Sequence, residues 1–510
     1  MNIAFRVDVS TLTGSGHFMR CLTLADRFRL RGDTTRFVCR SIPEHFARML
    51  VAGGHELAEL PAASNPVIAS DPDGGYAGWL GVAQEQDADD TVAALAGRSW
   101  DWLVVDHYAI DRRWETCLRK SASGILVIDD LADRDHDCDW LLDQNRIDGG
   151  NAYRNRVPAA CGVLLGPRYA LLREEFARQH QNALPRQGEV RRVFVCFGGV
   201  DASGYTLHAI QALAGMGAAD LAVDVVTGAQ NPHLEDIRVL CARYGYACHI
   251  QTDRMAGLMA AADLAIGAGG VNLWERCAAG LPALVVITAE NQREQVDVAA
   301  RLGVIYVPDQ SADLAGMLAS HLYALIRNRR LRHALSAQGI QTVDGRGAAR
   351  VVAALSFRAV TFRRAAPQDC ETLFAWRNHP DIRKYSHDPA PISPDVHRDW
   401  YAAVMRDTSR ILLIGSCDGD DLGVVRFDLN AAHEAEISIY LTPARLQSQM
   451  GEPLLIGAER WLLENLPGVS RIRATVQAAN AASNALFRRA GYHPESTTFF
   501  KDLDRISTRP

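Results

Sequence analysis

The sequence predicts an α/β protein in which two Rossmann-like domains in series are followed by a smaller α+β domain. Short apolar runs alternate with amphipathic stretches over the first 356 residues, a pattern typical of parallel strands joined by helices. The alternation restarts after a short break at residues 185–188, so it indicates two domains. Beyond residue 360 the pattern changes, because strands flanking hairpin-like turns replace the strand–helix repeat.

The first domain is predicted over residues 1–165 and the second over residues 166–356. In the first, a glycine loop leads from the opening strand into a helix at about residues 17–31, whose apolar positions keep helical spacing. The strands predicted for this domain are residues 3–9, 37–39, 102–105 and 125–128. Those of the second are residues 193–197, 223–227, 264–266, 284–287 and 304–307.

The third domain is predicted over residues 357–510, about the usual size of one domain. Its predicted strands are residues 360–364, 411–414, 423–427, 434–441 and 471–476. Its predicted helices are residues 367–377, 452–463 and 481–489. Antiparallel strands beside separate helices predict the α+β class.

The bulk composition excludes some classes of function. Hydrophobic residues make up 48% of the 510 residues and charged residues 22%, as in ordinary globular proteins. The formal net charge of −6 gives no support for binding nucleic acid or an acidic membrane surface. The eleven cysteines form no C-x-x-C pair, and no uncharged apolar stretch reaches membrane-spanning length. We therefore expect a cytoplasmic protein without a signal peptide or a structural metal site.

The strand-to-helix turn of the first domain carries the first candidate site, at residues 8–17. Gly14 and Gly16 allow a ligand to approach the backbone, and the N-terminus of the following helix attracts anions. The same helix end favours a neutral imidazole at His17, as a general base for water requires. Alternatively, His17 caps the helix or binds phosphate. Asp8 could orient His17 or hold the substrate.

Other carboxylates also end predicted strands, where the ligands of α/β proteins gather. They are Asp106 and Asp129, and His107 follows the first of them. Taken singly, each carboxylate is interpreted as a hydrogen-bonding loop residue, and His107 as a packing residue.

A second glycine loop follows the strand predicted at residues 264–266. The N–H groups of Gly269, Gly270 and Val271 could hold a diphosphate at a helix N-terminus. Asn272 lies in the first turn of that helix. Glu275, one turn on, could accept both hydroxyls of a ribose, or it could simply complement the helix dipole.

Three segments carry a resemblance to a known family. They are Phe5-Arg6-Val7-Asp8 with Gly14-Ser15-Gly16-His17, Leu165-Gly166-Pro167-Arg168-Tyr169-Ala170-Leu171-Leu172-Arg173, and residues 269–282. On these segments, residues 1 to about 355 resemble the hydrolase of pseudaminic acid biosynthesis, which removes UDP from UDP-2,4-diacetamido-2,4,6-trideoxy-β-L-altropyranose. That family is similar in fold to the GT-B glycosyltransferase that attaches N-acetylglucosamine to lipid-linked muramyl peptide, so the resemblance implies a GT-B-like pair of domains.

The resemblance also implies a reaction and a partner. A UDP-amino sugar would be hydrolysed without a metal ion, water attacking the anomeric carbon with inversion. His17 would be the base for that water, and amides at the helix end would stabilise the leaving UDP. Arg168 and Arg173 would lie near the cleft, where either could pair with phosphate. The other interpretation of both arginines is a solvated helix face or an interdomain salt bridge.

Three segments of the third domain resemble the GCN5-related N-acetyltransferases. They are Thr361-Phe362-Arg363-Arg364-Ala365, Ile437-Ser438-Ile439-Tyr440-Leu441 and Asn480-Ala481-Ala482-Ser483-Asn484-Ala485-Leu486-Phe487-Arg488-Arg489-Ala490-Gly491-Tyr492. In that family a glycine-rich loop after the fourth strand holds the pyrophosphate of acetyl-CoA at a helix N-terminus. The resemblance implies acetyl-CoA as cosubstrate, with Gly451 in the loop and Asn480 and Asn484 in the later segment that faces it.

The loop at residues 445–453 departs from the family pattern. Of about three glycines expected, only Gly451 is present. Gln447 and Gln449 would crowd the amides that face phosphate, and the charge of Glu452 opposes anion binding. Phe487 stands where many members have a tyrosine that protonates the thiolate of CoA.

An active third domain would acetylate the 4-amino group of the UDP-sugar that precedes the hydrolase substrate. Glu436 is then a candidate acceptor for the amine proton, or else a plain strand-edge charge. Two alternatives remain for the whole chain. One is a GT-B glycosyltransferase that uses a UDP-sugar with His17 as base, and the other is a hydrolase with a non-catalytic acetyltransferase-like module.

Overall fold

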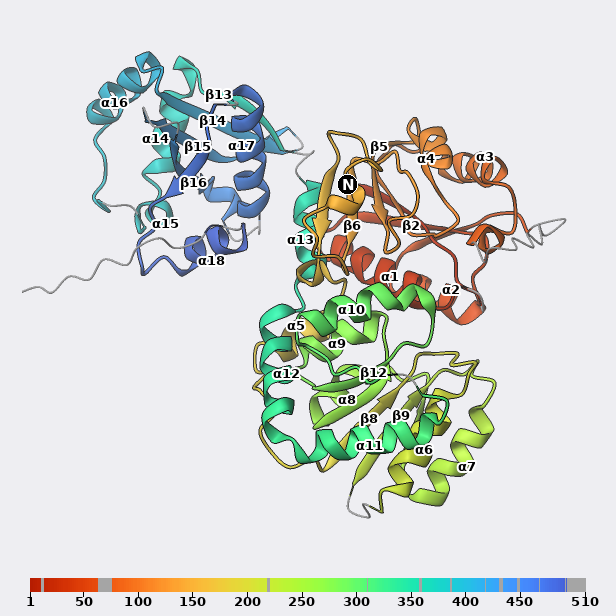
Figure 1. Cartoon of the computed structure of the whole chain (residues 1–510). Coiled ribbons are helices and arrows are strands. Elements are labelled where there is room, and N and C mark those ends of the chain that lie inside the picture. The colour runs from red at the N-terminus through yellow and green to blue at the C-terminus, as the bar shows by residue number, and fades with distance from the viewer. Residues whose placement is uncertain are drawn as a thin grey trace, which may run out of the picture. The chain divides into compact units, whose positions relative to one another are not determined.

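A computed structural model describes the greater part of the chain. The ranges described are residues 1–10, 13–62, 76–217, 221–309, 311–356, 360–385, 388–417, 419–430, 434–446, 450–466, 468–490 and 492. They belong to two compact units, Met1–Val352 and Ala353–Pro510 (Figure 1). Within these ranges, no helix combines the length and the apolar character needed to cross a bilayer.

The first lobe of the larger unit is built on a parallel sheet in the order β3-β2-β1-β4-β5-β6-β7. Its strands are β1 (Asn2–Arg6), β2 (Thr34–Cys39), β3 (Glu56–Glu59), β4 (Trp100–Val105), β5 (Ala122–Ile128), β6 (Trp140–Asp143) and β7 (Gly162–Leu165). Its helices are α1 (Gly16–Arg29), α2 (Glu44–Ala52), α3 (Gln84–Leu95) and α4 (Arg112–Leu118). The central strands are mostly apolar because both faces of the sheet are covered. Leu95 and Trp114 cover one face, and Phe18 of α1 packs against Phe37 on the other.

The second lobe repeats this architecture with a five-stranded parallel sheet in the order β10-β9-β8-β11-β12. Its strands are β8 (Arg192–Cys196), β9 (Ala222–Thr227), β10 (Ala247–Ile250), β11 (Leu264–Ala268) and β12 (Ala283–Val286). Its helices, with the connecting α5, are α5 (Glu174–His180), α6 (Tyr205–Gly215), α7 (Leu234–Tyr244), α8 (Met255–Ala261), α9 (Val271–Ala278), α10 (Arg293–Arg301), α11 (Leu314–Arg327), α12 (Arg329–Thr342) and α13 (Gly347–Ser356). Separate apolar clusters lie on the two faces of this sheet.

The strand orders determine where ligands can bind. In each sheet, successive strands are added first on one side of the opening strand and then on its other side. The strand order therefore reverses between β1 and β4 in the first lobe and between β8 and β11 in the second. Such switch points leave a crevice outside the carboxyl ends of the strands. A methyl group placed on Gly16 would lie 4.0 Å from Val271 Cγ2, and one on Gly199 would lie 4.0 Å from Ser15 Oγ. The loops at the two switch points are therefore neighbours.

The smaller unit contains one sheet in the order β13-β14-β15-β16-β17, antiparallel except for the last pair. Its strands are β13 (Val360–Arg364), β14 (Arg410–Cys417), β15 (Asp420–Leu429), β16 (Glu434–Leu441) and β17 (Arg471–Ala474). Its helices are α14 (Cys370–Arg377), α15 (Pro380–Arg383), α16 (Pro394–Arg406), α17 (Gly451–Asn465) and α18 (Ala481–Arg489). One apolar cluster joins the sheet to α17 and a second joins it to α14 and α16.

The two parallel sheets and the mixed third sheet confirm the predicted fold class. One predicted strand is wrong: in residues 304–307, only Tyr306 forms a bridge, to Leu284. The segment runs into Pro308, which has no N–H to continue a ladder. Strands β3, β6, β7 and β10 were not predicted; each has only four residues, and β3 and β10 lack the buried apolar run by which the equally short β12 was found.

Candidate active site

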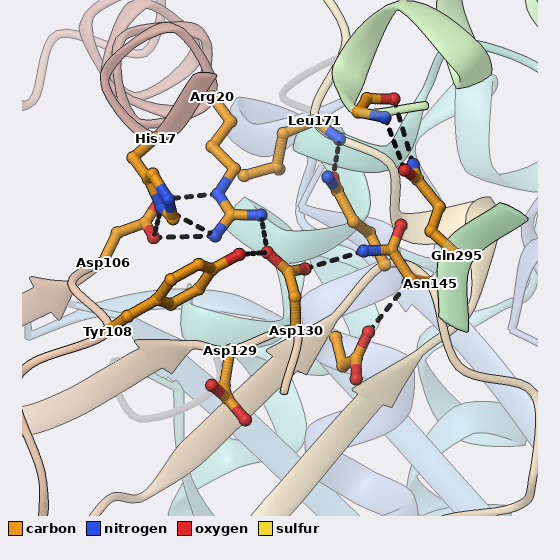
Figure 2. A network of polar contacts seen from close by, with 12 residues as sticks. His17, Arg20, Asp106, Tyr108, Asp129, Asp130, Asn145, Leu171 and Gln295 are labelled. Atoms are coloured by element: carbon orange, nitrogen blue, oxygen red, sulfur yellow. Dashed lines mark hydrogen bonds and ion pairs between the residues drawn. The ribbon is translucent and has the colours of Figure 1, made fainter. Parts of the chain in front are cut away.

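His17 lies in the first turn of α1, directly after the loop that follows β1. Its Nδ1 is 2.6 Å from Oδ1 of Asp106, the residue after β4 (Figure 2). Arg20, one helical turn along α1, donates from Nε and Nη2 to both oxygens of Asp106 at 2.6 and 2.7 Å. The first switch point therefore brings together a histidine and a carboxylate 89 residues apart.

The charge of Asp106 fixes which imidazole nitrogen can act as a base. Burial alone would raise the pKa of its carboxyl, but Arg20 and His17 outweigh burial and hold that pKa well below its usual range. The carboxylate is therefore ionised and accepts the proton of His17 Nδ1, which leaves Nε2 as the basic nitrogen. This arrangement suits a general base that is held in a single tautomer and orientation.

Aromatic rings that the sequence interpretation missed surround His17. Tyr108 lies edge-on to the imidazole with ring centroids 4.5 Å apart, and Trp79 lies edge-on at 6.2 Å. Trp79 stacks on Tyr108, and Tyr76 packs against both rings. In the sequence, only the position of Tyr108, two residues after the strand-ending Asp106, could have indicated that an aromatic ring lies at this site.

Asp8 does not orient His17, contrary to one of its two predicted roles. It accepts the backbone N–H groups of Arg40 and Ser41 at 2.6 and 3.1 Å and pairs with Arg6 at 2.9 Å. Burial would raise the pKa of Asp8, but Arg6 and His107 hold it far below its usual range. With 2% of its surface exposed, Asp8 stabilises the ends of β1 and β2.

Behind Asp106, a second group of buried carboxyls contains a protonated member. The hydroxyl of Tyr153 lies 2.9 Å from Asp129 and 2.8 Å from Asp143. A phenol carries one proton and can donate to only one of them, so the other carboxyl must donate to it. Burial and the neighbouring Asp130 raise the pKa of Asp143 to about 7, which identifies Asp143 as the protonated partner.

The loop after β11 is arranged differently from the prediction. The N–H of Gly270 was expected to face a diphosphate, but it donates to Gln295 Oε1 of α10 at 2.6 Å, and Gln295 Nε2 donates back to Gly270 O at 3.0 Å. Gly270 has φ +84° and ψ −164°, a conformation that essentially only glycine adopts. A methyl group on Gly269 would be crowded, since it would lie 3.0 Å from Val296 Cγ2 and 3.1 Å from Gln292 Cβ.

The first turns of α9 carry the other predicted residues of this loop. Asn272 donates to Cys196 Sγ at 3.3 Å, so it bridges the ends of β11 and β8. Glu275 is 4% exposed, and its Oε1 accepts a hydrogen bond from Arg173 at 3.1 Å. The other carboxylate oxygen, Glu275 Oε2, has no hydrogen-bond partner among the residues that the structure describes. Burial raises the pKa of Glu275 despite Arg173. This salt bridge joins two residues of the second predicted domain, so it is not the interdomain salt bridge of the second interpretation.

Arg168 lies apart from these contacts. Its side chain is exposed and stacks over Tyr169, with the guanidinium carbon 5.2 Å from the ring centroid. Its backbone oxygen accepts a hydrogen bond from Arg350 at 2.7 Å. In the described ranges, no three or more His, Cys, Asp and Glu side chains are grouped so that they could hold a metal ion.

In the smaller unit, the predicted site residues lie around β16 and the helices that follow it. β16 pairs with β17 only from Glu434 to Ile437, so residues 438–441 continue beyond that pairing. Gly451 begins α17 and lies against Leu486 of α18. Gln447 and Gln449 lie outside the described residues. Arg445, at the start of the loop, pairs with Asp420 at 2.8 Å.

The two predicted asparagines hold the start of α18. Asn480 is its N-cap and accepts the N–H of Ser483 at 3.0 Å, and Asn484 donates to the backbone oxygens of Gln477 and Asn480 at 2.9 Å. Phe487 packs in the apolar cluster against the sheet. Asn480 thus caps the helix, and Asn484 ties its second turn to the segment that precedes it.

Two polar groups near β16 are also engaged. Tyr492 donates to Glu459 at 2.7 Å, and burial raises the pKa of the Tyr492 phenol. Glu436 accepts from Arg473 at 3.2 Å and from Thr475 at 2.9 Å, and 41% of its side chain is exposed. Glu436 lies on an interior strand, paired with Asp428 on one side and Arg473 on the other, so it is not at an edge of the sheet.

These features define a two-lobed parallel α/β unit with a carboxylate-held histidine at its first switch point, followed by an acyltransferase-like unit. Residues 359–493 match the family described as Acetyltransferase (GNAT) domain, so the smaller unit has the GNAT fold.

Relatives of the larger unit include the family that the sequence resembles. The UDP-2,4-diacetamido-2,4,6-trideoxy-beta-L-altropyranose hydrolase of Campylobacter jejuni is 26% identical over 239 residues, which are 47% of this chain and 73% of that protein. The spore coat polysaccharide biosynthesis protein SpsG of Bacillus subtilis is 29% identical over 226 residues, or 41% of this chain and 63% of that protein. These matches confirm the predicted relationship.

A longer relative and a solved structure complete the comparison. An uncharacterised protein of Methanocaldococcus jannaschii is 22% identical over 451 residues, which cover 83% of this chain and 84% of that protein. The crystal structure of MurG from Acinetobacter baumannii is 12% identical and covers 69% of this chain and 98% of its own, with a TM-score of 0.47.

Proposed function

We propose that the larger unit hydrolyses a UDP-linked 2,4-diacetamido-2,4,6-trideoxy sugar, of the kind named for the Campylobacter jejuni relative. The observation that carries the proposal is the His17–Asp106 pair at the first switch point, next to the loop of the second lobe. A histidine fixed with Nε2 as its basic nitrogen is suited to take a proton from water.

In the proposed reaction, water attacks the anomeric carbon while the bond from that carbon to the UDP oxygen breaks. One proton of the water passes to His17 Nε2, and UDP leaves with the electron pair of the broken bond. The N-terminus of α9 would stabilise the charge on the diphosphate. Glu275 Oε2 is buried and has no hydrogen-bond partner among the described residues, and in this proposal it accepts a ribose hydroxyl once the nucleotide is bound.

Incubation with the UDP-sugar alone tests this proposal. We expect free UDP and the free sugar, identified by mass spectrometry and proton NMR, without any acceptor. Product that forms only when an acceptor is added would instead support a glycosyltransferase. His17→Asn should abolish UDP release while calorimetry still detects UDP binding, and release near the original rate would refute the role of His17.

We also propose that the smaller unit transfers an acetyl group from acetyl-CoA to the 4-amino group of the preceding UDP-sugar. The GNAT match supports the cosubstrate, and the stretch of β16 beyond its pairing with β17 offers backbone groups to the amides of CoA. The amine nitrogen would attack the thioester carbon, the C–S bond would break, and CoA would leave as the thiolate with the electron pair of that bond. The amine proton would pass to solvent or to Glu436.

Calorimetry with acetyl-CoA, followed by incubation with the 4-amino UDP-sugar, tests this second activity. We expect binding and an acetylated product whose mass rises by one acetyl group. Absence of binding at millimolar acetyl-CoA would refute acetyl transfer and leave a non-catalytic module.

A further inference from the structure

A continuous chain of buried hydrogen bonds connects the second lobe to His17. Trp274 of α9 donates from Nε1 to Asn145 Oδ1 at 2.8 Å, across 129 residues of sequence. Asn145 Nδ2 donates to Asp130 Oδ1 at 2.8 Å, and Asp130 Oδ2 accepts from Arg20 Nη1 at 2.6 Å. Arg20 then holds Asp106, which holds His17 (Figure 2).

The chemistry of its members gives this chain one arrangement only. The indole of Trp274 can only donate, and the carboxylate of Asp130, which is ion-paired with Arg20, accepts. The Asn145 amide between them must therefore present its oxygen to the indole and its nitrogen to the carboxylate. Rotating the amide by half a turn would oppose donor to donor and acceptor to acceptor, at a site where buried polar groups need partners.

We propose that Trp274 and Asn145 are positioning residues for His17, which couple the proposed nucleotide-binding helix α9 to the orientation of the catalytic imidazole. The inference rests on the proposed function, because it takes His17 as the base. Trp274 lies between Asn272 and Glu275 on α9, so nucleotide contacts that shift α9 also shift the first donor of the chain. Arg20 spans Asp130 and Asp106 with separate nitrogens and so transmits the position of one carboxylate to the other.

The test compares two Trp→Phe changes that remove the same atoms, including one buried indole hydrogen-bond donor each. Trp274→Phe breaks the chain at its first link. Trp100→Phe is the matched control, since Trp100 is also buried and its Nε1 donates to Leu95 O at 2.9 Å, outside the chain. We expect Trp274→Phe to lower kcat for UDP release by about tenfold, while the Kd for UDP changes less than about twofold. Trp100→Phe should leave both within about twofold.

A double-mutant cycle tests whether Trp274 and Asn145 act through one chain. In a shared chain, the Trp274→Phe/Asn145→Leu protein loses no more kcat than Asn145→Leu alone. If the double variant instead loses kcat by the product of the two single-variant factors, the two residues act independently and the coupling is refuted. If thermal denaturation shows that Trp274→Phe does not fold, Asn145→Leu takes its place in the comparison with Trp100→Phe.

A readout independent of turnover separates this inference from the proposed function. The proton on His17 Nδ1, shared with Asp106 at 2.6 Å, should give a protected imidazole N–H resonance, assigned by its loss in His17→Asn. We expect faster solvent exchange of that proton in Trp274→Phe and no change in Trp100→Phe. An unchanged resonance in Trp274→Phe, or equal effects of the two variants, would overturn the inference. If the wild-type protein releases no UDP, the proposed hydrolase activity is refuted. The solvent exchange of the His17 N–H proton would still show whether Trp274 positions His17.

Discussion

Asp106→Asn is the substitution that most directly tests how His17 is held. The carboxylate has 1% of its surface exposed and receives three short hydrogen bonds, from His17 at 2.6 Å and from Arg20 at 2.6 and 2.7 Å. An asparagine retains one acceptor, loses the charge and turns an N–H₂ group toward donors. Breaking a buried ion pair in this way costs about 3–5 kcal/mol of unfolding free energy. Loss of the fixed tautomer should lower kcat by about a hundredfold to ten-thousandfold.

The control for this variant is Asp8→Asn. Asp8 is equally buried and ion-paired but makes no contact with His17, so its replacement should lower stability without lowering kcat more than about threefold. UDP release at saturating substrate and urea denaturation at pH 7 measure the two effects. Equal losses of kcat in the two variants, or a loss below about threefold in Asp106→Asn, would refute the orienting role of Asp106.

The pH dependence of stability gives a second measure of the same group. The folded-state pKa of Asp106 is depressed, so its stabilising contribution is present above the ordinary carboxyl pKa of about 4 and declines as the pH falls below that value. Asp106→Asn should therefore lose less stability than the wild type between pH 5 and pH 3 in urea denaturation. A wild-type slope retained in the variant would contradict the depressed pKa.

Three further predictions concern the surroundings of the site. Asp143 has a folded-state pKa raised to about 7, so its stabilising effect is greatest below about pH 4 and is lost as the pH rises through 7. In urea denaturation, the unfolding free energy of the wild type should decrease by about 2 kcal/mol between pH 5 and pH 8, and Asp143→Asn should remove this decrease. Glu275→Gln should weaken UDP binding at least about tenfold in calorimetry but leave pyrophosphate binding unchanged, since its free oxygen is proposed to contact ribose. Gly270→Ala forces a side chain into a glycine-only conformation and should lower the unfolding free energy by about 1–3 kcal/mol, whereas a neutral effect would contradict the backbone geometry.

The sequence was sufficient to find His17 but not the residues that hold it. His17 stands in a local signal, a glycine loop between a strand and a helix. The choice among Asp8, Asp106 and Asp129 depends on strand order, since β4, which ends before Asp106, lies beside β1, whereas β5, which ends before Asp129, does not. No local pattern fixes that order, so the orienting carboxylate became visible only in the structure.

Contacts between distant elements account for the other differences. Gln295 lies on an amphipathic helix with no motif around it, yet its amide occupies both backbone groups of Gly270, 25 residues away. Trp274 was part of the recognised glycine run, but its function depends on Asn145, whose segment carried no signal. The fold class needed only apolar periodicity and was predicted, whereas these pairings depend on the three-dimensional packing of α9 and α10.

The hydrogen bond from Trp274 to Asn145 also has an evolutionary consequence. Two-lobed proteins can diversify by recombination, in which one lobe from one ancestor is joined to the other lobe from a second. Here the first lobe supplies the acceptor Asn145 and the second supplies the donor Trp274, so a chimera would inherit His17, Arg20 and Asp106 intact and still lack a matched junction. Each lobe has a sheet and an apolar core of its own, so a chimera would have to match this junction even where both lobes fold.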